Sequence, residues 1–254
     1  MTHIEKKSSF VEVIPKAMLK RIFLFLLFPA GVFAQDLEAI GSQKPFAVNG
    51  SLDVRGIGYT ANGIAARRSP FMYMISGSPV ISVYGISIPL YFTYSEQDRS
   101  FRQPFNQFGM SPTYKWATLH AGYRNLTFSP YTLAGHTMLG AGVELNPGKL
   151  RLGFMAGRLN RATTIDTTTG AVQPYSFSRH GYAAKIGVGT EDNYFDLSFL
   201  SAKDAEKGFK GDLATSQVRP AANVVIGGDL KLTLAGKFFV FADGGISVYP
   251  GDRN

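Results

Sequence analysis

The 254-residue chain contains no cysteine. Disulfide bonds, thiolate metal sites and a lipid anchor on an N-terminal cysteine are therefore excluded. Charged residues are also scarce, since Asp, Glu, Lys and Arg together make up only 17% of the sequence, while glycine accounts for 28 residues and aromatics for 13%. This balance is typical of strands that face lipid on one side.

The sequence also lacks the strong motifs of catalysis and cofactor binding. It has no Walker loop, no G-x-G-x-x-G, no nucleophile elbow, no H-E-x-x-H and no cluster of metal ligands. We therefore predict no catalytic residues, no cofactor and no metal. One alternative stays open, in which His120 acts with Ser129 and Asp196 as a membrane-embedded hydrolase, although no spacing links the three. The simpler interpretation is a polar interior histidine that is hydrogen-bonded to its neighbours.

One continuous apolar run stands near the N-terminus, at residues 22–33. Lys20 and Arg21 precede it and Ala34 follows it, which is the order of an export signal that is cut after Ala34. The run is too short to span a bilayer as a helix, which needs roughly 20 residues. We expect residues 1–34 to be an N-terminal extension with a cleavable signal peptide, and residues 35–254 to form the mature domain. A buried N-terminal helix is the alternative.

Apolar residues alternate with polar or small ones through the second half of the chain. In the clearest segment, Leu139, Ala141 and Val143 alternate with Gly140 and Gly142. Such period-two patterns predict strands, and their length of about ten residues is what a tilted strand needs to cross a bilayer. The segments with this pattern are 139–145, 150–157, 182–189, 195–199, 224–234 and 239–248.

The connections between these segments alternate in length. Short turns at 146–149, 191–193 and 235–236 alternate with long polar loops at 161–177 and 203–219. Outer-membrane barrels show this asymmetry. We therefore predict an all-β fold, specifically an antiparallel transmembrane up-and-down β-barrel of about ten visible strands. A soluble β-sandwich or a lipocalin-like barrel is the alternative.

The first half of the chain fits this scheme less well. When crossings are counted from a periplasmic N-terminus, the turn at 146–149 falls on the outside, whereas the loop lengths place it inside. One connection must hide a missed strand or fold back into the barrel, and the candidates are residues 96–113 and 125–137. The final strand ends at Tyr249 before Pro250, without a terminal aromatic, so we expect an incomplete barrel; closure with ten strands is the alternative.

The strand positions opposite the apolar row carry charged residues that would face the interior of a barrel. Acids and bases are almost balanced there, which predicts paired networks rather than strong ion selectivity. An open pore and a filled, structural barrel would both show this balance. The candidate lumen-facing residues are Asp53, Arg55, His120, Glu144, Arg151, Lys185, Asp196, Asp229, Lys231 and Asp243.

The whole chain carries a formal net charge of +8 at pH 7. An exported chain without a basic helix is a poor nucleic-acid binder, so we expect no nucleic-acid partner. Basic loop residues could instead meet the phosphates of membrane lipid, or attract small anionic solutes. Ordinary solvated loop charge is the plainer alternative.

The block from Tyr114 to Arg161, YKWATLHAGYRNLTFSPYTLAGHTMLGAGVELNPGKLRLGFMAGRLNR, resembles blocks in Gram-negative outer-membrane β-barrel proteins of the Bacteroidota. The resemblance covers about a fifth of the chain and names no activity. It implies a place in the outer membrane, contact with its lipid and insertion by the barrel-assembly machinery. The expected role is a passive one, a porin-like channel or a structural or surface-binding barrel. An outer-membrane enzyme acting on lipid or peptide and a soluble periplasmic binding barrel are the alternatives.

Overall fold

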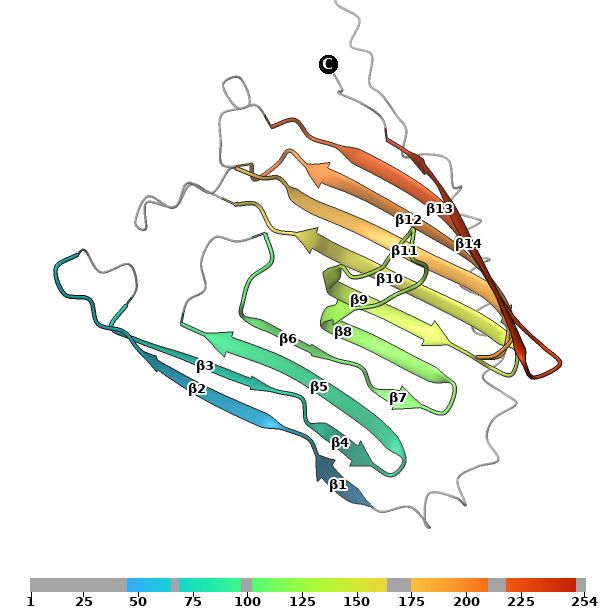
Figure 1. Ribbon diagram of the computed structural model, residues 1–254, viewed down its shortest axis with the longest axis horizontal. Helices are drawn as coiled ribbons and strands as arrows, with labels where there is room; N and C mark the ends of the chain where they lie inside the picture. The colour runs from blue at the N-terminus through green and yellow to red at the C-terminus, as the bar shows by residue number, and fades with distance from the viewer. Residues whose placement is uncertain (1–44, 65–68, 97–101, 164–174, 210–217, 250–254) are drawn as a thin grey trace, which may run out of the picture. The chain divides into compact units, whose positions relative to one another are not determined.

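The computed structural model describes residues 45–64, 69–96, 102–163, 175–209 and 218–249 (Figure 1). The chain divides into two units, residues 1–44 and residues 45–254. The expected signal peptide falls in the first unit, outside the described residues. Among the described residues, no helix is long and apolar enough to cross a membrane.

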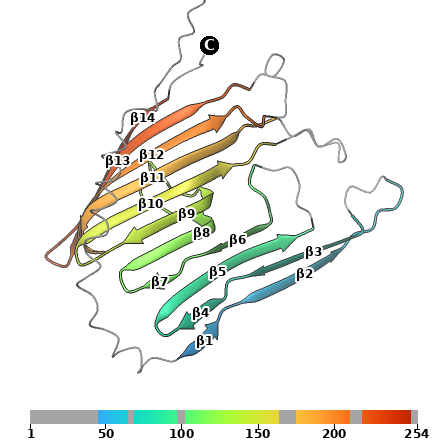
Figure 2. The same cartoon turned by 180° about the vertical axis from the view of Figure 1, so that it is seen from behind.

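In the described residues of the second unit, fourteen strands form one antiparallel, all-β sheet (Figures 1 and 2). Neighbours in the sheet follow the order β1-β4-β5-β6-β8-β9-β10-β11-β12-β13-β14, with β2 beside β3, β3 also paired with β5, and β7 paired with β5 and β8. The strands are β1 (Phe46–Asn49), β2 (Leu52–Gly58), β3 (Phe71–Gly77), β4 (Val80–Val83), β5 (Ile86–Ser95), β6 (Gln107–Met110), β7 (Thr113–Tyr114), β8 (Ala117–Asn125), β9 (Thr137–Leu145), β10 (Leu150–Asn160), β11 (Ser178–Gly189), β12 (Tyr194–Ala205), β13 (Ala222–Leu234) and β14 (Phe238–Val248).

Three pairs of consecutive strands are interrupted halves of one longer strand. Two residues separate β1 from β2, β3 from β4 and β6 from β7, and the last two interruptions contain Pro79 and Pro112. Proline interrupts a ladder because it has no amide donor. Counting each pair once leaves eleven strands, against the ten or so that were predicted. The additional strand is β6 with β7, whose short halves carry too few alternating positions to show a period.

Tight turns and long loops alternate along the whole sheet. Tight turns join β4 to β5, β7 to β8, β9 to β10, β11 to β12 and β13 to β14, and longer connections join the other ends. In two of these turns both central residues have positive φ, Tyr84–Gly85 and Ala235–Gly236, as hairpins with matching twist require. The missed strand in residues 96–113 is β6 with β7. With this additional strand, the count of crossings and the loop lengths place the turn at 146–149 on the same side of the sheet.

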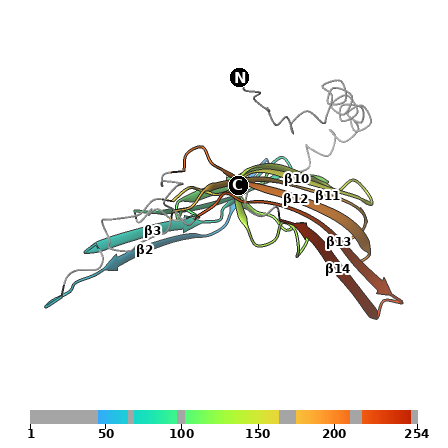
Figure 3. The same ribbon diagram turned by 90° about the horizontal axis from the view of Figure 1, so that it is seen from above.

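The connection between β8 and β9, residues 126–136, folds back across one face of the sheet (Figure 3). We call this segment the inner loop and the face that it covers the inner face. The loop is closed by the Phe128 amide, which donates to the Leu133 carbonyl over 2.8 Å, and by a turn at 129–132. Its apolar side chains form the buried core with the sheet: Leu126, Phe128, Leu133, Met138, Met155, Leu159, Ala183, Leu200, Ala202 and Val225.

Glycines on the inner face make room for the inner loop. A Cβ atom at Gly153 would lie 2.9 Å from the Phe128 ring, and one at Gly245 would lie 2.7 Å from the Cβ of Tyr131. At Gly227 a Cβ would lie 3.1 Å from the Ser129 hydroxyl. The loop backbone therefore lies closer to β10, β13 and β14 than larger residues at these positions would allow.

Gly227→Val should destabilise the protein, because the added side chain points into the inner loop. Overpacking of this kind costs about 1–3 kcal/mol. Gly228→Val is the matched control, since a Cβ there would meet its nearest atom, in the Leu197 side chain, at an ordinary 3.7 Å. Urea unfolding of both variants measures the difference. Equal losses of stability would contradict the packing of the loop on β13.

Candidate functional site

The strand register places all ten candidate lumen-facing residues on the inner face. Asp196, Asp229 and Asp243 are directly opposite one another on β12, β13 and β14, and directly paired residues point to the same side of a sheet. The same pairing extends through β11, β10, β9 and β8 to β6, β5, β3 and β2, where it reaches Asp53 and Arg55.

Seven of the ten residues gather in one polar band across β8–β14, and three do not join it. Asp53 and Arg55 lie on β2, near the other end of the strand order, where they face each other over 3.9 Å with both side chains well exposed. The Lys231 ammonium donates to the carbonyl of Glu191 in the β11–β12 turn over 2.8 Å. The polar band consists of His120, Glu144, Arg151, Lys185, Asp196, Asp229 and Asp243.

A bidentate ion pair between Arg151 and Asp196 links β10 to β12 across β11, the strand between them. Arg151 Nε lies 2.8 Å from Asp196 Oδ1, and Arg151 Nη2 lies 2.9 Å from Asp196 Oδ2. Gly187 of β11 is directly opposite both residues, and a Cβ there would collide with the Asp196 carboxylate. Because Gly187 has no side chain, the Arg151 guanidinium and the Asp196 carboxylate can contact each other across β11. The arginine also lies over the Tyr194 ring, 4.4 Å from its centre.

A second polar chain runs from β8 to β11. His120 Nδ1 lies 2.8 Å from the Ser111 hydroxyl, and His120 Nε2 lies 3.1 Å from Glu144 Oε2. The other oxygen of Glu144 is 3.6 Å from Lys185 Nζ. Gly153 separates Glu144 from Lys185 in the register, so a glycine again allows charged groups to meet across a strand.

His120 does not join Ser129 and Asp196 in a catalytic arrangement. Its side chain is buried, and both ring nitrogens are engaged by Ser111 and Glu144. Ser129 and Asp196 instead line a cavity to which His120 does not contribute. The geometry therefore matches the simpler interpretation of a hydrogen-bonded interior histidine, and the hydrolase alternative finds no support.

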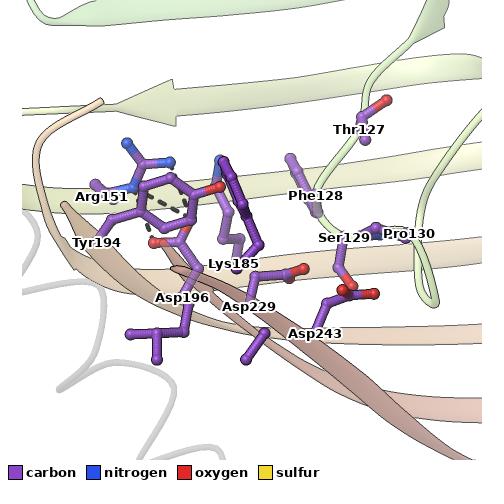
Figure 4. A pocket seen from close by; sticks show the side chains of 13 residues that line it. Thr127, Phe128, Ser129, Pro130, Arg151, Lys185, Tyr194, Asp196, Asp229 and Asp243 are labelled. Carbon is purple, nitrogen blue, oxygen red and sulfur yellow. Dashed lines mark hydrogen bonds and ion pairs between the residues drawn. The ribbon is translucent and has the colours of Figure 1, made fainter. Parts of the chain in front are cut away.

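The cavity beside the polar band has a volume of about 290 Å³ (Figure 4). The inner loop supplies Phe128 and Ser129, and β12, β13 and β14 supply Asp196, Asp229 and Asp243. The sequence patterns assigned the aspartates to the interior but did not assign the two loop residues there. The sequence analysis named residues 125–137 as one of two segments that could fold back into the barrel. This was the one sequence signal that pointed to the position of the loop residues. Among the described residues, no group of three or more His, Asp or Glu is placed to hold a metal ion.

The opposite, outer face is apolar and exposed. Ile226 is 58% exposed and Ile246, its partner on β14, is 77% exposed. Soluble monomers rarely present contiguous apolar patches larger than a few hundred Å², and here large exposed apolar side chains occur on β8 and on every strand from β10 to β14. They include Leu119, Phe154, Tyr182, Ile186, Val188, Phe195, Leu197, Val224, Ile226, Ile246 and Val248.

Asp196→Asn should destabilise the protein by about 3 kcal/mol, because it leaves the largely buried Arg151 guanidinium without its counter-charge. Gly187→Ala should act through the same contact by displacing the carboxylate. The double variant should therefore lose much less than the sum of the single losses. Unfolding free energies of the two single variants and the double variant test this. Asp53→Asn, in an exposed pair worth about 0–1 kcal/mol, is the control, and strict additivity would contradict the shared contact.

The chain matches no protein-family model, no curated protein and no solved structure.

Proposed function

We propose that this chain is an outer-membrane β-barrel protein whose inner face lines the lumen and whose outer face contacts lipid. The observation that carries the proposal is the contrast between the two faces of one sheet. The outer face exposes large apolar side chains on β8 and on β10–β14, while the inner face holds the polar band and the inner loop. Lipid-facing and lumen-facing residues alternate in this way along barrel strands.

In the described residues the sheet is open, so its closure into a barrel is part of the proposal. Among the described residues, β14 pairs only with β13, and β2 pairs only with β3. Unpaired backbone groups cost several kcal/mol each in hydrocarbon, so a sheet in lipid has to leave no open edge. A closed barrel would meet this requirement.

The proposed location and partners follow from the same reasoning. An export signal would deliver the chain across the inner membrane, and the barrel-assembly machinery would insert it into the outer membrane. Membrane lipid would then cover the outer face. The tight turns would lie at the periplasmic side and the long loops outside, as in other such barrels.

The proposed role is passive, a porin-like channel that the inner loop narrows. The loop covers part of the inner face, and a polar cavity remains beside it. A barrel with only a structural or surface-binding role is the second candidate, favoured by the paired charges that fill the band. The two candidates differ in whether ions pass.

Ile226→Lys should weaken folding into phospholipid vesicles by about 2–4 kcal/mol, which is the cost of a lysine on the lipid face near the bilayer midplane. Ser247→Lys is the matched control, because Ser247 lies at a neighbouring level on the inner face of β14. Urea titrations of the inserted fraction, followed by heat-modifiable gel mobility, measure both variants. A wild-type chain that stays monodisperse in water without detergent would overturn the membrane proposal.

Replacing residues 128–133 with a Gly-Ser linker should raise single-channel conductance in a planar bilayer, because the inner loop would no longer narrow the lumen. The wild-type barrel should conduct through a smaller pore. Heat-modifiable mobility of the variant checks that the barrel has folded. Absence of conductance in both proteins would select the structural role instead.

A further inference from the structure

We infer that three basic side chains on the outer face, Arg158, His180 and Lys203, bind the phosphate of an anionic lipid headgroup. We call these three residues the basic row. The inference rests on the proposed membrane role and deepens it, because it names the lipid chemistry that the outer face recognises and the end of the strands at which it does so.

Strand pairing brings the basic row together on β10, β11 and β12, which are neighbours in the sheet (Figure 1). Arg158 is directly opposite His180, and His180 is directly opposite Lys203. Directly paired residues point to the same side of a sheet. That side is the outer face, because Arg158 lies four residues after Phe154 and His180 lies two residues before Tyr182, both of them exposed outer-face residues.

The basic row carries all the charge on this part of the outer face. The register assigns every second residue of β8–β14 to the outer face, and among these described positions there is no Asp or Glu. Arg158, His180 and Lys203 are the only Lys, Arg or His residues at these positions. Ordinary solvated charge gives no reason for all three bases to occupy one row of paired positions.

No carboxylate neutralises the row. In the part of the chain that the structure describes, no ion pair includes Arg158 or Lys203. The Arg158 guanidinium donates to the Tyr123 hydroxyl over 3.4 Å, and His180 Nε2 lies 3.0 Å from the Ser178 hydroxyl. The remaining N–H groups of the arginine and the lysine can donate to an anion. Phosphate oxygens accept strong, charge-assisted hydrogen bonds from such groups.

The position of the row along the strands suits a lipid headgroup. Arg158 lies eight residues after Leu150, the first outer-face residue of β10, and no outer-face residue between them is charged. Eight residues span about 26 Å along a strand, or about 20 Å along a barrel axis at a tilt of about 40°. This is close to the height of the apolar band of a barrel, about 25 Å. The basic row therefore lies at the edge of that band, at the long-loop end of the strands.

Aromatic side chains next to the row mark the same boundary. Tyr182 is 49% exposed on the outer face, two residues from His180, and its ring centre lies 5.8 Å from that of Phe199. Amphipathic rings settle where a membrane meets water. An aromatic pair beside a row of bases thus matches a surface that contacts acyl chains below and headgroup phosphates above.

Fluorescence quenching in vesicles tests this inference on the full chain. The reporter is Tyr182→Trp in a Trp116→Phe background, which leaves a single tryptophan next to the basic row. The chain is folded into phosphatidylcholine vesicles that contain phosphatidylglycerol, with bromine on the acyl chains of one lipid or the other. Brominated phosphatidylglycerol should quench the reporter more than its share of the bilayer predicts. Arg158→Gln with Lys203→Gln should lower the local association constant of phosphatidylglycerol by about fivefold for each base removed.

The matched control is Lys149→Gln with Lys237→Gln, which removes the same charge from two tight turns at the other end of the strands. This variant should keep the preference for phosphatidylglycerol at the reporter. An equal loss of preference in the control variant would overturn the inference. So would loss of the preference when inorganic phosphate is added at the concentration of the lipid, because the row would then bind free phosphate rather than a headgroup.

The two brominated lipids also separate this inference from the proposed function. Quenching by brominated phosphatidylcholine requires only that the reporter faces lipid. Quenching in proportion to the share of each lipid, with heat-modifiable mobility intact, would overturn the role of the basic row and leave the membrane proposal standing. Absence of quenching by either lipid would overturn both.

Discussion

The close approach of the inner loop to the sheet is the constraint on which the rest of the inner face depends. The loop buries Phe128 and Leu133 against the strands, and it does so only because glycine occupies the positions beneath it. Loop and sheet together exclude water from a surface that is otherwise rich in charge. The lower dielectric of that region strengthens the ion pairs formed within it.

Glycine has a second role on the same face, which is to let charged groups meet across a strand. Neighbouring strands lie about 4.8 Å apart, so side chains on alternate strands are separated by about twice that distance. The long side chains of Arg151 and Lys185 bridge this gap because Gly187 and Gly153 stand between them and their acidic partners. The two-residue glycine spacing seen in several strands therefore serves contact between side chains, in addition to close packing of backbones.

The two faces of the sheet are suited to different environments, one polar and one apolar. The inner face satisfies most of its polar groups internally, through Arg151 with Asp196 and through the chain from Ser111 to Lys185. The outer face is mostly hydrocarbon, with large apolar side chains such as Ile226 and Ile246 exposed. The proposed barrel, with the outer face in lipid and the inner face around a water-filled lumen, would suit both.

The sequence by itself determined the class of fold, the alternation of faces and the side on which each charged residue points, because the side-chain period of a strand is fixed at two residues. His120 and Asp229 could be assigned to the same face from the alternation of side chains along their strands alone. The tertiary structure decided which of those residues meet. The alternation of side chains does not give the distance between two strands. It could therefore not predict that Asp53 and Arg55 lie apart from the polar band. Nor could the place of Ser129, because the inner loop has no period and its position depends on glycines in strands up to about a hundred residues away along the chain.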